Sequence, residues 1–220
     1  MPIAFDTSAV GPSGGSPSIT WNHTCAGSDL ILFVATFTRS LPTGKVDSVT
    51  YNGVGMTEII AGGVAYEYIY TQLWYLIAPA IGSHAIVVNV GTPGVSPVTG
   101  ESCSYTGVLQ SGIPDASGTN SSDSATTLTK AITTVAQGCW IVVSGGCLNI
   151  PIRAITNLTL REKDPDYQGG IFDSNTALSA GSNSSTIGGT GSADAIGMVV
   201  ASFAPVSAPI VGPFPTHLNS

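Results

Sequence analysis

The sequence predicts an all-β protein built as an antiparallel β-sandwich, jelly-roll-like, with about a dozen strands. Three observations carry this prediction. Apolar and polar residues alternate with a period of two in many short segments, and β-branched residues are common there. Gly, Pro, Asn, Ser or Asp fills nearly every gap between these segments. No segment carries the i, i+3, i+4, i+7 apolar stripe of an amphipathic helix.

The predicted strands follow this alternation in chain order. They cover residues 3–6, 18–23, 30–38, 46–51, 54–60, 66–78, 84–90, 98–107, 128–134, 139–147, 154–161, 170–178 and 195–203. Short polar turns join them, which favours hairpin-connected sheets over βαβ units. A chain of 220 residues can form one large sandwich. We place a single domain at residues 1–204 and an extended Pro-rich C-terminal tail at residues 205–220.

The clearest local signal is a hairpin in the segment VDSVTYNGVGMTEI. Asn52 and Gly53 both tolerate positive φ, so together they predict a two-residue turn. The resulting register continues to Ser48 opposite Thr57. The next pair would bring two carboxylates together, and we therefore expect a bulge at Gly55.

Residues 73–78 read LWYLIA, so both faces of this strand are apolar. Such a strand is central and has a packing partner on each side. We expect the opposite sheet on one side and a neighbouring subunit on the other.

Two stretches break the strand pattern. Residues 109–127 are polar and predict a surface loop or a crossover between sheets. Residues 179–195 are a low-complexity Gly/Ser stretch and predict a mobile or elaborated loop.

Charged residues make up only 9% of the chain, against about 25% in typical proteins. We therefore expect an uncharged surface that other subunits partly cover, which predicts a homo-oligomer.

The formal net charge is −7 with six Lys and Arg, so the basic stripe of a nucleic-acid binder is missing. Scarce positive charge also disfavours an anionic membrane, and the longest apolar run, within residues 30–37, is too short to span one. The first residues lack the features of a secretory signal, which predicts synthesis in the cytoplasm.

Four cysteines, Cys25, Cys103, Cys139 and Cys147, occur without a C-x-x-C motif. This spacing excludes the usual zinc-ribbon and thioredoxin patterns. We favour buried thiols, and a disulfide between the last two remains the alternative.

No group of residues predicts catalysis. His23 and His84 lie in or beside strands, no G-x-S-x-G motif occurs, and the glutamates are isolated. Asp164 and Asp166 could offer oxygens to calcium, but a D-P-D turn needs no metal. We predict a protein that is not an enzyme and holds no cofactor or metal.

Two groups of residues are candidates for contact with a partner. Tyr66, Tyr68, Tyr70 and Trp74 form an aromatic set that suits a glycan platform if exposed, and a core or subunit interface if covered. In the tail, prolines favour an extended polyproline-like backbone. Such a tail is either disordered or lies across a partner, and its apolar residues, Ile210, Val211 and Phe214, are the candidate partner contacts.

Four segments carry a resemblance to a known kind of domain: SITWNHTCAGSDLILFVATF, VDSVTYNGVGMTEI, LWYLIAPAIGSHAIVV and SCSYTGVLQSGIPDA. They resemble strands of a jelly-roll-like β-sandwich domain that recurs in tailed-phage virion proteins and in environmental bacterial surface proteins. The resemblance covers roughly residues 3–114 and fades afterwards, although GCWIVVSGG fits a later core strand.

The resemblance implies a jelly-roll-like module used for decorating or attaching. With the missing signal sequence, the scarce charge, the all-β pattern and the extended tail, it favours a structural virion protein of a bacteriophage, a capsid decoration protein or a head-fibre protein. Its partners would be copies of itself, with a trimer as one candidate, and the major capsid protein or another virion protein. Its location would be the virion, after synthesis in the host cytoplasm. The alternative is a carbohydrate-binding or adhesive surface module that contacts a host-surface glycan.

Overall fold

The computed structural model describes residues 1–14, 17–39, 44–60, 69–91, 97–164, 166 and 168–206, and the backbone of residues 64–66. In this part of the chain the regular structure consists of β-strands, and all strand pairs are antiparallel. None of its segments is a helix that could cross a membrane. The predicted all-β antiparallel sandwich is confirmed, with more strands than the dozen expected.

The first half of the chain forms two sheets. The first inner sheet has the order β1-β10-β3-β8-β6, with β7 also on β8, and the first outer sheet has the order β2-β9-β4-β5. Their strands are β1 (Ala4–Val10), β2 (Ser18–Cys25), β3 (Ile31–Arg39), β4 (Ser48–Tyr51), β5 (Val54–Gly55), β6 (Thr57–Glu58), β7 (Val64–Tyr66), β8 (Ile69–Ile77), β9 (Gly82–Asn89) and β10 (Val98–Thr106).

The second half forms two more sheets. The second inner sheet has the order β11-β18-β13-β16-β15, and the second outer sheet has the order β12-β17-β14. Their strands are β11 (Ala116–Ala125), β12 (Thr127–Thr134), β13 (Trp140–Cys147), β14 (Ile152–Thr156), β15 (Thr159–Lys163), β16 (Gly169–Asp173), β17 (Gly181–Gly189) and β18 (Asp194–Phe203).

Both halves have the nested strand pairing of a jelly roll. In the first half β1 pairs with β10, β2 with β9 and β3 with β8. In the second half β11 pairs with β18, β12 with β17 and β13 with β16. The described chain is therefore a tandem of two jelly rolls with the same strand order, and both lie within the span predicted as one domain.

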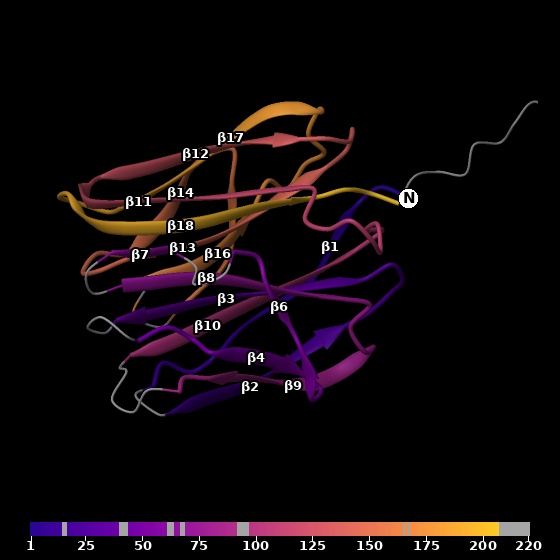
Figure 1. Ribbon diagram of the computed structural model, residues 1–220, viewed down its shortest axis with the longest axis horizontal. Helices are drawn as coiled ribbons and strands as arrows, with labels where there is room; N and C mark the ends of the chain where they lie inside the picture. The colour runs from indigo at the N-terminus through magenta and orange to yellow at the C-terminus, as the bar shows by residue number, and fades with distance from the viewer. Residues whose placement is uncertain are drawn as a thin grey trace, which may run out of the picture.

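The four sheets stack in layers, with the two inner sheets facing each other (Figure 1). Three apolar layers hold the stack together. One lies between the sheets of the first jelly roll and contains Trp21 and Val88. A second fills the second jelly roll around Ile187. The third is shared between the inner sheets and contains Phe33 and Phe203.

This stacking explains the strand that is apolar on both faces. Leu73 on β8 lies in the shared layer, whereas Trp74 lies in the layer of the first jelly roll. The second packing partner is therefore the other jelly roll of the same chain. The expectation of a neighbouring subunit at this face of β8 is wrong.

The two polar stretches contain strands, which the sequence patterns did not predict. β11 lies within residues 109–127 and pairs along β18 at the sheet edge. β17 lies within residues 179–195 and pairs with β12 on one side and β14 on the other. Backbone hydrogen bonds to flanking strands are available to any non-proline residue, so neighbours with stronger patterns can define a polar strand.

The predicted hairpin turns at Asn52 and Gly53, which have φ of 50° and 76°. The register ends sooner than expected, because the chain leaves the first outer sheet after Gly55 and enters the inner sheet as β6. Thr57 therefore pairs with Tyr75, and the predicted pair of Thr57 with Ser48 is wrong.

The two jelly rolls also share backbone details. Gly82 and Gly181 begin equivalent strands with φ of 106° and 123°. Asn157 follows β14 with φ of 59°, as Asn52 follows β4. The predicted strand 154–161 is consequently two strands, β14 and β15, with a turn between them.

Candidate functional site

The structure places part of the predicted aromatic set. Tyr70 and Trp74 both lie on β8. Trp74 is 5% exposed and belongs to the core of the first jelly roll, so its ring offers no platform to a glycan. Tyr70 is half-buried. The side chain of Tyr66 and the whole of Tyr68 lie outside the described residues. The predicted tail contacts, Ile210, Val211 and Phe214, also lie outside them.

His23 on β2 lies in a buried polar network that sequence reasoning did not predict. Its imidazole contacts two serine hydroxyls on β10: Nδ1 is 2.9 Å from Ser102 Oγ, and Nε2 is 3.0 Å from Ser104 Oγ. Ser104 donates to Asp6 Oδ2 at 2.8 Å, and the Trp21 indole N–H donates to Ser102 at 3.1 Å. Burial lowers the pKa of His23 to about 4, against a smaller raising effect of Asp6. His23 is 1% exposed, so this network joins the two sheets and presents no imidazole to solvent.

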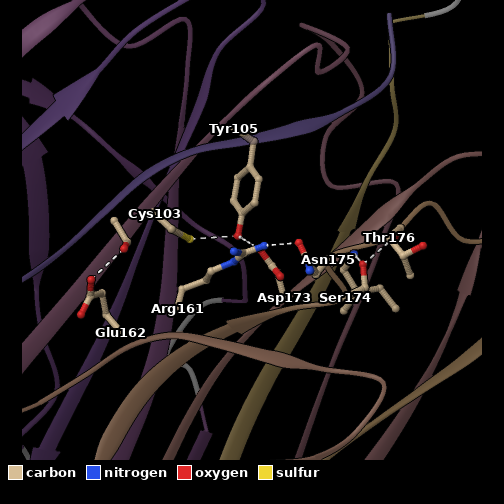
Figure 2. Close-up of polar contacts among 10 residues, drawn as sticks. Cys103, Tyr105, Arg161, Glu162, Asp173, Ser174, Asn175 and Thr176 are labelled. Carbon is tan, nitrogen blue, oxygen red and sulfur yellow. Dashed lines mark hydrogen bonds and ion pairs between the residues drawn. The ribbon is translucent and has the colours of Figure 1, made fainter.

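A second polar network connects the two jelly rolls (Figure 2). Tyr105 on β10 donates its hydroxyl to Asp173 Oδ2 on β16 at 2.8 Å. Arg161 on β15 donates Nε to the same oxygen at 2.6 Å and Nη2 to Asn175 Oδ1 at 2.6 Å. The guanidinium also lies 4.0 Å from the ring centre of Phe5 on β1. A fully buried carboxylate is thus shared by one residue from each jelly roll.

Three further carboxyl groups, of Glu101, Glu162 and Asp164, lie close enough to affect one another. Ser8 on β1 donates to Glu162 Oε1 at 2.7 Å, again across the two jelly rolls. Asp164 accepts from the backbone N–H of Gly169. Glu101 on β10 is fully buried, and neither of its carboxyl oxygens has a hydrogen-bond partner among the described residues. Burial raises the pKa of Glu101 well above its ordinary value, and the charges of Asp164 and Glu162 raise it further.

Side chains of the types that bind metal ions do not cluster in the described part of the chain. Within the described ranges no group of three or more His, Cys, Asp or Glu side chains could hold a metal ion. Cys25, Cys103, Cys139 and Cys147 are all buried and free. Burial raises the pKa of the Cys139 thiol to about 11 and that of Cys147 to about 12, so both are poor nucleophiles near neutral pH.

The outward face of the first outer sheet is uncharged. Apolar residues of β2, β9 and β4 point into the core, and the alternate positions point away from it. The outward residues are Ser18, Thr20, Asn22 and Thr24 on β2, Ser83, Ala85, Val87 and Asn89 on β9, and Ser48 and Thr50 on β4. Asn89 donates to Ser48 across the strands at 3.2 Å.

The second outer sheet has the same character at the opposite end of the stack (Figure 1). On β12 and β17 the outward residues are Thr127, Thr129, Ala131, Thr133, Ser182, Ser184 and Thr186. The hydroxyls of Thr129 and Thr186 lie 2.9 Å apart across the strands. Arg153 adds one charge on the edge strand β14. The double jelly roll therefore carries a hydroxyl-rich, nearly charge-free face on each outer sheet.

An apolar groove lies at the end of the second jelly roll, where the described chain leaves β18. Its volume is about 590 Å³, and it is lined by residues that include Ile3, Trp140, Ala177, Pro205 and Val206. The first jelly roll has a smaller groove of about 390 Å³ at the equivalent end. Polar residues are more prominent there, and they include Ser28, Asp29 and Gln110.

The strand order defines this protein as a tandem of two jelly rolls, and the outward faces of its two outer sheets carry few charged residues. The chain matches no family model, no curated protein and no solved structure in comparisons with known proteins. Of what the resemblance implied, the structure confirms the antiparallel β-sandwich architecture.

Proposed function

We propose that this protein is a structural component of a tailed-phage particle, a capsid decoration or head-fibre protein that acts through its surfaces. The observation that supports this most is the scarcity of charge on the two outer faces. Proteins that stay dispersed usually carry about 25–35% charged residues on their surface. The seventeen outward positions named above on β2, β9, β4, β12 and β17 carry none, whereas the exposed Arg153 on β14 carries one charge.

The interior supports a scaffold role. The His23 network, the Asp173 network and the apolar layer between the inner sheets fix the relative positions of the sheets. The side chains of these two networks bond to one another across the sheets. The jelly roll is also an architecture that capsid domains use, which is an analogy of fold.

The proposal is tested with the purified chain and empty capsids of the phage that carries it. We expect the chain to co-sediment with the capsids in a saturable manner and to self-associate in solution. Replacing Thr20 and Thr129 by Lys places charge on both outer faces and should weaken co-sedimentation about tenfold or more, since burying unpaired charge is costly. Lys45→Ala is the matched control at an exposed position. A monomer that never sediments with capsids would contradict the proposal.

A second candidate is a carbohydrate-binding module, because lectins also use jelly rolls and Asn22 and Asn89 offer amides on an open face. A glycan array separates the two functions. Specific binding that is lost in Asn22→Ala but kept in Lys45→Ala would favour the carbohydrate module. The buried ring of Trp74 takes no part in this test.

A further inference from the structure

We propose that the apolar groove beside Trp140 binds the Pro-rich tail of a second copy of this chain, so that exchanged tails join neighbouring molecules. The inference extends the proposed structural role and rests on it only for its biological use.

The groove is mainly apolar. Ile3, Ala177 and Pro205 form part of its wall, and the largely buried Trp140 lies at its base. Grooves lined by aromatic and apolar residues recognise Pro-rich segments, because such segments are already extended and lose little entropy on binding. The tail that follows Val206 reads SAPIVGPFPTHLNS and has no charged side chain apart from a histidine. An apolar groove and an uncharged apolar segment are complementary.

The path of the chain favours a groove on another copy. The tail begins at the rim of its own groove, because Val206 is one of the lining residues. A polyproline conformation advances about 3.1 Å per residue. Phe214, eight residues beyond Val206, would then lie roughly 25 Å away. An extended tail therefore carries its apolar residues away from the groove at its base.

The first jelly roll shows what happens when the chain continues from the equivalent position. There residues after β10 form the linker to β11, and Gln110 becomes part of the wall of the smaller groove. Its amide donates to the carbonyl of Val108 at 2.7 Å and of Leu30 at 3.3 Å. The linker thus passes beside the groove and leaves it open.

Sedimentation velocity over a range of protein concentrations tests the inference. The unmodified chain should self-associate, and the tail variant I210S/F214S should dissociate at least tenfold more readily. Ala177→Arg should have the same effect, because Ala177 is exposed and a charged side chain there would fill the groove without entering the core. The control is Ile81→Arg, which changes the equivalent groove of the first jelly roll at a residue 66% exposed and should leave association unchanged.

A labelled peptide of residues 207–220 gives a second measurement. It should bind the full chain, with binding weakened at least tenfold in Ala177→Arg and unchanged in Ile81→Arg. The inference is overturned if the unmodified chain is monomeric throughout, if association survives both the tail and the groove variants, or if the peptide binds both groove variants equally. Co-sedimentation with capsids is scored separately, so tail exchange without capsid binding contradicts the proposed function alone.

Discussion

Tyr105 and Phe203 occupy equivalent positions in the two jelly rolls, and their rings contact each other in the shared core. Tyr105 pairs with Ile31, the first residue of β3, and Phe203 pairs with Trp140, the first residue of β13. Their ring centres are 5.1 Å apart with an interplanar angle of 51°. The contact therefore joins the last strand of one jelly roll to the last strand of the other.

Replacing Phe203 by Ala should destabilise the protein by about 3–5 kcal/mol, because a fully buried aromatic ring is removed from a packed layer. Denaturant unfolding followed by tryptophan fluorescence measures the change. The control is Val135→Ala at a residue 73% exposed, where a change within about 0.5 kcal/mol is expected. A loss below about 1 kcal/mol for Phe203→Ala would mean that the inner sheets are not packed together as described.

Arg161→Ala should cost about 3–5 kcal/mol, because it leaves the fully buried Asp173 without its cationic partner. The exposed Arg153→Ala serves as the control and should have little effect. Replacing Asp173 by Asn in the Arg161→Ala background removes the uncompensated charge. It should recover part of the lost stability in the same unfolding measurement, and a further loss would show that the buried charge is not the cause.

Some features of this architecture are readable from residues alone. The polar/apolar alternation of β2 is a local property and predicts a strand correctly. The Asn-Gly pair at Asn52 is also local and predicts the hairpin turn correctly. The apolar content on both faces of β8 predicts a layer on each side. It does not tell whether the second layer belongs to the same chain.

The features that could not be predicted depend on contacts between distant residues. β17 consists mostly of Gly and Ser, and its neighbours on both sides define it as a strand. His23 and Ser102 are remote in sequence and meet only when β2 packs against the inner sheet. The one signal that could have indicated the tandem is the spacing of strands, since β2 with β3 and β12 with β13 are separated by similar turns.

Glu101→Gln should stabilise the protein increasingly as the pH rises. The pKa of the Glu101 carboxyl is higher in the folded state than its ordinary value of 4.5, so the folded state binds this proton more tightly. The stability of the unmodified protein therefore falls as the pH rises from 4.5 toward the folded pKa, and the variant lacks this loss. Unfolding free energies at a series of pH values test this, with Asp123→Asn as an exposed control. A stability difference independent of pH would contradict it.

His23 should make the protein less stable in acid. Its pKa falls from 6.5 to about 4 on folding, so the folded state binds this proton less tightly. The stability it contributes is complete above pH 6.5 and is lost as the pH falls toward 4, by about 3 kcal/mol in total. His23→Gln should remove this part of the pH dependence, and His84→Gln is the control. Equal pH profiles for the unmodified protein and His23→Gln would exclude this role.

Hydrogen exchange of the capsid-bound protein, compared with the free protein, tests most directly whether the uncharged outer faces are contact surfaces. We predict slower backbone exchange on binding in at least one of the outer strand sets, β2 with β9 or β12 with β17, and no change in the inner strands β3 and β13. Protection confined to the connecting loops, with both outer sheets exchanging as in the free protein, would contradict the account.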